Sequence, residues 1–128
     1  MRIEIKNKKT MRNFLGSGYH PILIDVVCWM YDEFKDFSYY VFGVAEIIFT
    51  CGYREGSTGV HGTIPTRGID IRSWVFKHPE EIEKKINDTW IYDPERPEMN
   101  VAWVHDSGKG SHFHIQVHPN TVRRDEIL

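Results

Sequence analysis

Five segments of the chain have the residue pattern of β-strands. They are residues 2–6, 39–50, 68–72, 101–104 and 113–117. Polar and apolar residues alternate in the first and third segments, which is the period of two expected of a half-buried strand. The second is rich in β-branched and aromatic residues, although its later half would also suit the end of a helix. The residues between His105 and His112 are mostly small or polar, which predicts a hairpin between the last two strands.

Apolar residues recur at helical spacing in two longer segments, residues 21–36 and 79–92. Each segment begins with a proline, which is suited to the first turn of a helix. In the second segment Ile82 and Ile86 fall on one face, and acidic residues lie near its start. Helices and strands mix along the chain without a repeat or a linker. The sequence therefore predicts one α+β domain over residues 1–128, with a small antiparallel sheet flanked by helices.

Composition excludes several classes of protein. Of the 128 residues, 41% are hydrophobic and 27% are charged, which is typical of a folded domain. The formal net charge of −2 provides no basic excess for general nucleic-acid binding. No apolar run approaches the ~20 residues of a membrane-spanning helix, and the start of the chain lacks the pattern of a secretory signal peptide. The two cysteines, Cys28 and Cys51, have apolar neighbours, and we expect them to be small buried side chains.

Candidate chemistry lies at Arg54, in residues 61–70 and in the His112-Phe113-His114 triplet. Residues two apart in a strand point to the same face, so His112 and His114 are expected to project together. Two neighbouring imidazoles resist joint protonation, and such a pair suits a shared metal ion or a proton transfer. A His-x-His triplet alone is a weak signal, since most such histidines lie on the surface or form hydrogen bonds.

Three of these residues together make a stronger pattern. His61, Asp70 and His114 would supply a nitrogen, an oxygen and a nitrogen to one metal ion. Three protein ligands with a fourth position left to water is the arrangement of catalytic zinc, whereas structural zinc has four protein ligands. Imidazole and carboxylate ligands without a thiolate also suit a hydrolytic zinc ion.

The order and spacing of several motifs resemble those of the M15 family of zinc peptidases. The motifs are Thr50-Cys51-Gly52-Tyr53-Arg54-Glu55, Ser57, His61, Gly68-Ile69-Asp70 and His112-Phe113-His114. That family includes D-alanyl-D-alanine carboxypeptidases and phage L-alanyl-D-glutamate endopeptidases. The resemblance covers about residues 44–118 and implies the hedgehog/DD-peptidase-like fold.

The resemblance also implies a site and a reaction. The zinc ligands would be His61, Asp70 and His114, holding one ion, with Arg54 and His112 as catalytic residues. The implied reaction is hydrolysis of peptide bonds in bacterial peptidoglycan by metal-bound water. Arg54 would bind a substrate carboxylate or stabilise developing negative charge, and His112 would transfer protons.

The chain departs from the family pattern at the general base. Ser111 stands where many members have an acidic residue. Either His112 takes over proton transfer, or a carboxylate such as Asp106 reaches the site, or the enzyme is weak. His105, Asp106 and Ser57 are candidates to line the site, whereas the tryptophans at positions 74, 90 and 103 are expected in the core.

The expected partner is a peptidoglycan stem peptide, with no nucleic acid or membrane, and the expected state is a monomer. The resemblance favours a phage-encoded protein that is made in the host cytoplasm and acts on the cell wall or belongs to the virion. The alternative is a non-catalytic metal-binding or structural phage protein that retains the peptidase fold.

Overall fold

A computed structural model of the chain describes residues 2–34, 46–73, 76, 78–106 and 111–126. Its main sheet has five strands in the order β1-β2-β3-β6-β5, and β4 pairs with β7 in a separate two-stranded sheet. The strands are β1 (Arg2–Ile5), β2 (Glu46–Cys51), β3 (Gly68–Arg72), β4 (Trp90–Ile91), β5 (Ala102–Asp106), β6 (Ser111–Gln116) and β7 (Val122–Arg123). The predicted mixture of helices and strands is confirmed.

The main sheet is antiparallel except at one edge. β2, β3, β6 and β5 run antiparallel to their neighbours, whereas β1 is parallel to β2. Parallel neighbours need a crossover connection, and the segment between β1 and β2 contains two helices. The small, mainly antiparallel sheet agrees with the prediction, and the β1–β2 pair adds one parallel edge to it.

The helices are α1 (Lys8–Ser17), α2 (Pro21–Phe34) and α3 (Pro79–Thr89), with short 3-10 helices η1 (Val60–Gly62) and η2 (Arg124–Glu126). α2 and α3 begin at the prolines that predicted them. α3 ends three residues earlier than predicted, because Trp90 adopts an extended conformation and pairs with β7. α1 was not predicted. Residues 35–36, at the end of the predicted first helix, and residues 39–45 of the predicted second strand lie outside the described residues.

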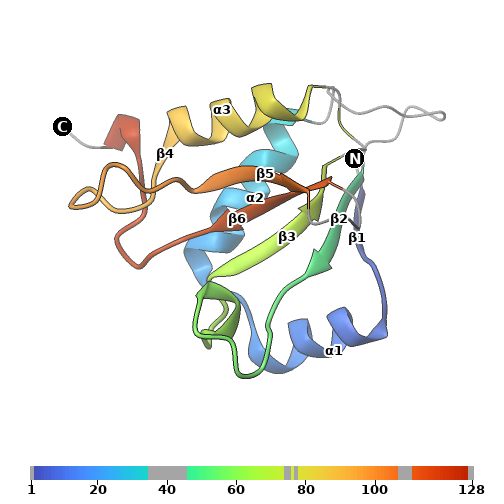
Figure 1. Cartoon of the computed structure of the whole chain (residues 1–128). Helices are drawn as coiled ribbons and strands as arrows, with labels where there is room; N and C mark the ends of the chain where they lie inside the picture. Colours follow the sequence, from blue (N-terminus) through green and yellow to red (C-terminus); the bar gives the residue numbers. More distant parts are fainter. Residues whose placement is uncertain (1, 35–45, 74–75, 77, 107–110, 127–128) are drawn as a thin grey trace.

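One face of the sheet packs into the hydrophobic core. Ile69, Ile71, Phe113 and Ile115 are fully buried and belong to one cluster of apolar side chains. The cluster also contains the buried residues of α2 and α3. Figure 1 shows α2 crossing behind the sheet, α3 above it and α1 below it. The other face of β3, β6 and β5 is therefore available for polar side chains.

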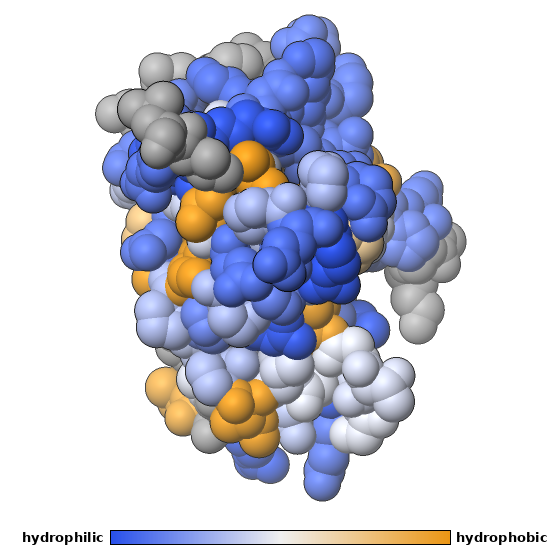
Figure 2. All heavy atoms as spheres, turned by 90° about the vertical axis from the view of Figure 1, so that its left-hand side faces the viewer, coloured by the Kyte–Doolittle hydropathy of each residue, from blue (hydrophilic) through white to orange (hydrophobic). Residues whose placement is uncertain are grey.

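One face of the molecule is mostly polar. Figure 2 shows this face with small, separate hydrophobic patches on a hydrophilic background. No helix among the described residues has both the length and the apolar character needed to cross a lipid bilayer. Cys28 is exposed and Cys51 is half-buried, so the expectation that both cysteines are buried is wrong.

Candidate metal centre

Strand register places the candidate residues on one face of the sheet. His114 of β6 lies opposite Asp70 of β3 and opposite Trp103 of β5. His112, two residues earlier, lies opposite His105. Because side chains alternate along a strand, these residues all face away from the core that Phe113 and Ile115 enter. The predicted shared orientation of His112 and His114 follows from this register.

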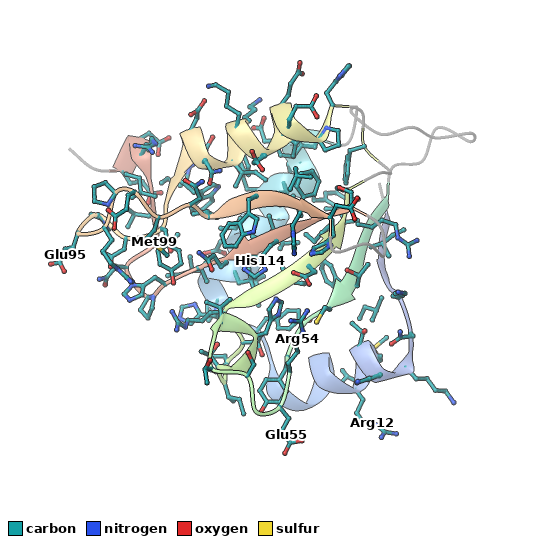
Figure 3. The ribbon with its side chains drawn as sticks, viewed as in Figure 1. Arg12, Arg54, Glu55, Glu95, Met99 and His114 are labelled. Carbon is teal, nitrogen blue, oxygen red and sulfur yellow. The ribbon has the colours of Figure 1, made fainter. Side chains whose placement is uncertain are left out.

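Two loops bring the remaining candidates to this face. Arg54 lies in the turn after β2, and His61 lies in η1, where it is 6% exposed. The Arg54 N–H donates to the His61 carbonyl oxygen at 2.7 Å and so ties the loops together. Gly52 is required beside them, because a Cβ atom there would lie 2.1 Å from the Tyr19 hydroxyl oxygen. Figure 3 shows Arg54 on the same side of the sheet as His114.

The three predicted metal ligands converge on one point. Asp70 Oδ1 lies 3.3 Å from His61 Nε2 and 3.1 Å from His114 Nδ1. One ligand atom from each residue lies within 4.8 Å of the others, so this group could hold a metal ion. Ligand atoms about 2.1 Å from a tetrahedral ion are separated by about 3.4 Å. The spacing around Asp70 is thus close to what such an ion needs.

Hydrogen bonds on the far side of each imidazole determine which nitrogen faces Asp70 with a lone pair. His61 Nδ1 donates to the Gly52 carbonyl oxygen at 2.6 Å. His114 Nε2 donates to Gln116 Oε1 at 3.4 Å, and the Gln116 amide is oriented by its own donation to the Asn100 carbonyl at 3.0 Å. In a neutral imidazole the second nitrogen then carries the lone pair. Such outer partners orient and support metal-binding histidines.

The Asp70 carboxylate is 4% exposed and stays ionised. Burial alone raises the pKa of Asp70, but the hydrogen bonds from His114 and His61 outweigh burial and hold that pKa well below its usual range. Arg54 Nη2 also lies 3.3 Å from Asp70 Oδ2. A metal ion held between two neutral imidazoles would use both nitrogen lone pairs and the carboxylate oxygen at once.

Arg54 is held from two directions and still reaches solvent. Its Nε donates to Cys51 Sγ at 3.0 Å, and its Nη2 donates to Asp70 Oδ2. The side chain is 56% exposed. The guanidinium therefore borders the metal centre with part of its donor set open to a ligand. The role of Cys51 as acceptor was not predicted, because it depends on the fold of the turn after β2.

The cavity at the centre has a volume of about 380 Å³. It is lined by Arg54, His61, Asp70, Trp103, His105, His112 and His114. His112 Nε2 lies 3.8 Å from Asp70 Oδ2, which is too far for a hydrogen bond, and the His105 ring is 5.0 Å from the His112 ring. His105 thus lines the site as predicted.

The prediction that Trp103 lies in the core is wrong. Its ring lies 4.4 Å from the His114 ring, and the side chain is only partly buried on the cavity side of β5. Because side chains alternate along a strand, Trp103, two residues before His105 on β5, is expected on the same face as His105. Trp90 is buried as predicted, and Trp74 lies outside the described residues.

Two of the predicted lining residues, Ser57 and Asp106, do not line this cavity, and neither does Ser111 at the usual general-base position. Ser57 Oγ accepts a hydrogen bond from the Gly59 N–H within its own turn. Asp106 is exposed at the end of β5 and, by alternation from His105, belongs to the opposite face. The Ser111 hydroxyl is paired with the Ser73 hydroxyl at 2.7 Å. Of the proton-transfer alternatives raised by the sequence, His112 is the residue that this cavity contains.

Comparison of the chain with family models, with curated proteins and with solved structures gives no match. Membership of the M15 family therefore stays a prediction from the motifs. The functional argument rests on the geometry around Asp70.

Proposed function

We propose that this protein is a zinc-dependent peptidase of the M15 type, with the hedgehog/DD-peptidase-like fold, that hydrolyses peptide bonds of bacterial peptidoglycan. One observation carries the proposal: His61 Nε2 and His114 Nδ1 face Asp70 Oδ1 while the other nitrogen of each ring is hydrogen-bonded. This leaves two nitrogen lone pairs and one carboxylate oxygen directed at the same space.

The ligand set suits a hydrolytic zinc ion. It has two imidazoles, one carboxylate and no thiolate, and three protein ligands leave a coordination position open. When bound, zinc supplies Lewis acidity that lowers the pKa of a water molecule in that position and polarises a substrate carbonyl. Asp70 is buried and ionised, so it contributes negative charge to hold the cation.

Arg54 has the position and chemistry to bind a substrate oxygen. Its guanidinium is permanently charged, borders the cavity and is 56% exposed. A peptide carbonyl or carboxylate beside the metal centre would meet this group. Fixed cations of this kind stabilise negative charge that develops during the reaction.

His112 is the candidate for proton transfer. It lines the cavity on the same strand face as His114 but makes no hydrogen bond to Asp70 at 3.8 Å. In the proposed reaction His112 accepts a proton from the attacking water and delivers it to the leaving amine. Ser111, which occupies the usual acidic position, is paired with Ser73 and has no acidic group to offer.

The proposal is tested with purified protein and purified peptidoglycan. We expect about one zinc ion per chain and release of free amines that a chelator abolishes. Arg54→Ala should retain zinc and lose about 10²–10³ in turnover, the usual effect of removing one such donor. Arg12→Ala, an exposed arginine on α1 away from the cavity, is the matched control and should retain turnover. Full turnover by Arg54→Ala would exclude its catalytic role.

A non-catalytic metal-binding protein is the second candidate. It is favoured by one observation, the serine pair at Ser73 and Ser111 where a general base would be acidic. Stoichiometric zinc without any amine release would favour this second candidate. If the protein shows neither bound zinc nor turnover, both candidate functions are rejected.

A further inference from the structure

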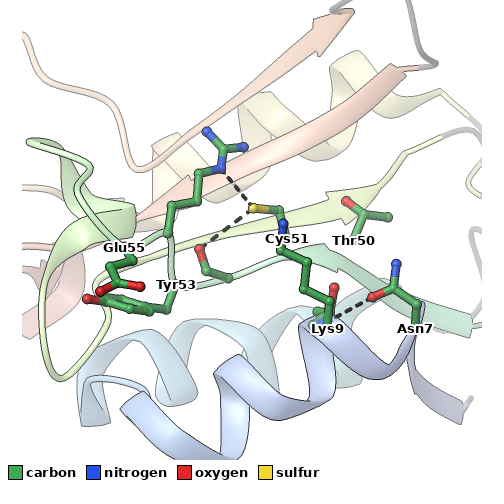
Figure 4. Close-up of a pocket in the computed structure, with 9 residues that line it drawn as sticks. Asn7, Lys9, Thr50, Cys51, Tyr53 and Glu55 are labelled. Atoms are coloured by element: carbon green, nitrogen blue, oxygen red, sulfur yellow. Dashed lines mark hydrogen bonds between the residues drawn. The ribbon is translucent and has the colours of Figure 1, made fainter.

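A second cavity adjoins the candidate metal centre. It lies between the start of α1 and the end of β2 and has a volume of about 560 Å³. Its lining comprises Asn7, Lys9, Thr10, Thr50, Cys51, Gly52, Tyr53, Arg54 and Glu55. Figure 4 shows α1 forming one wall and the end of β2 with its following turn forming the other.

Arg54 lines both cavities. Its Nε is bonded to Cys51, which lines the second cavity, and its Nη2 is bonded to Asp70, which lines the metal centre. The two cavities are therefore neighbours that share Arg54 as a cationic wall.

One wall of the second cavity comes from the most basic segment of the chain. Residues 1–12 contain five basic residues and one acidic residue, so this segment carries a formal charge of +4 in a chain whose total is −2. Lys9, from this segment, is exposed at the cavity, and Figure 4 shows its side chain extending from α1 toward Cys51, away from Glu55. The Lys9 ammonium group therefore attracts anions, although the net charge of the chain is negative.

The uncharged polar side chains nearby already serve the fold. Asn7 Oδ1 accepts a hydrogen bond from the Thr10 N–H at the start of α1. Thr50 Oγ1 donates to the Asp70 carbonyl oxygen at 3.3 Å. Recognition of a charged ligand group in this cavity therefore falls to Lys9 and Arg54.

We propose that this second cavity is a subsite for a carboxylate-bearing residue of the substrate, with Lys9 and Arg54 as the recognising cations. The inference rests on the proposed peptidase function for its substrate class. It adds Lys9 as a specificity-determining residue and places the carboxylate-bearing side of the substrate against α1.

The test is a binding measurement on metal-free protein, from which the chelator has been removed, so that a carboxylate cannot bind a metal ion. Two probes, N-acetylalanine and N-acetylalanine amide, differ by a single carboxylate. Nuclear magnetic resonance titration should show N-acetylalanine shifting the amide signals of Thr50 and Tyr53, with weaker binding of the amide. Lys9→Gln should weaken N-acetylalanine binding about two- to fivefold, as expected of an exposed ion pair, and Lys9→Arg should restore it.

Lys8→Gln is the matched control, because Lys8 is an exposed neighbour that does not line the cavity. It removes the same charge and should change binding less than Lys9→Gln. Equal binding of the two probes, equal effects of the two variants, or tighter binding of inorganic phosphate at the same signals would overturn the carboxylate subsite.

The two proposals can fail separately. Lys9-dependent binding without cleavage of peptidoglycan would reject the peptidase function and leave the subsite in place. Cleavage of peptidoglycan without Lys9-dependent binding would reject the subsite alone.

Discussion

Asp70 and Asp93 are both buried carboxylates with histidine neighbours, but their other partners differ in kind. Asp93 accepts hydrogen bonds from the Glu95 N–H and the Arg96 Nε, each at 3.1 Å, and lies 3.9 Å from His118 Nδ1. That His118 nitrogen already accepts the Asn120 N–H at 3.0 Å. The main partners of Asp93 are therefore hydrogen-bond donors from the turn that follows it.

Around Asp70 each imidazole has a hydrogen-bond acceptor on the far side of its ring, so a neutral ring presents a lone pair on the side of the carboxylate. Gly52 and Gln116 take the protons of His61 and His114 on the far sides of the rings. A carboxylate beside a histidine is therefore not by itself a metal site. The two regions differ in which group accepts the hydrogen bond from the N–H of each imidazole.

The largest expected difference between the two aspartates is in metal affinity. Asp70→Asn removes a charged ligand, so its zinc affinity should fall by more than about 100-fold, because loss of outer partners alone costs 10–100-fold. Asp93→Asn should bind zinc as the unaltered protein does. Titration with a zinc indicator measures the zinc affinity of both variants. Similar zinc affinities for Asp70→Asn and Asp93→Asn would show that Asp70 is not a metal ligand.

Metal binding should also stabilise the fold through Asp70 and not through Asp93. At a free zinc concentration 100 times the dissociation constant, binding adds about 2.7 kcal/mol to the free energy of unfolding. Thermal unfolding should show this gain in the unaltered protein and in Asp93→Asn. A similar zinc-dependent rise in Tm for Asp70→Asn would place the ion elsewhere.

The outer partner of His114 gives a smaller effect. Gln116→Ala removes the acceptor that orients the ring, and we expect a 10- to 100-fold loss of zinc affinity. Asn120→Ala is the matched change beside Asp93 and should leave zinc affinity unchanged. An unchanged affinity in Gln116→Ala would mean that the ring orientation does not depend on this bond.

The smallest effect concerns stability against acid at Asp93. Burial alone raises the pKa of Asp93, but the hydrogen bonds from the Glu95 backbone and the Arg96 side chain hold that pKa below its ordinary value. A lowered pKa in the folded state stabilises the fold above the unfolded value of about 3.9, and this contribution is lost as the pH falls further. Asp93→Asn should therefore lower the Tm at pH 7, with a smaller difference at pH 3. A difference that is the same at both pH values would contradict this account.

Strand alternation predicted part of the site before any coordinates. It placed His112 and His114 on one face, and the motif order added His61 and Asp70 as their companions. The same rule, applied forward from His114 and back from His105, would also have found Gln116 and Trp103. Both were missed because amide and indole side chains carry no metal-ligand signal of their own.

Other features depend on contacts between distant segments that local patterns do not contain. The role of Gly52 as acceptor for His61 arises from two loops that pack together. α1 is as amphipathic as α3, but Gly16 and Gly18 near its end are typical of a turn and weaken the helix signal. Cys28 has apolar sequence neighbours but lies on the exposed face of α2, which a run of apolar letters cannot show.

A crystal structure of zinc-soaked protein would show whether His61, Asp70 and His114 bind one metal ion. We expect one ion about 2.0–2.2 Å from His61 Nε2, His114 Nδ1 and Asp70 Oδ1, with Gly52 and Gln116 still bonded to the opposite nitrogens. Zinc bound through His61 Nδ1 or His114 Nε2, zinc bound at Asp93, or no ion at saturating zinc would contradict it.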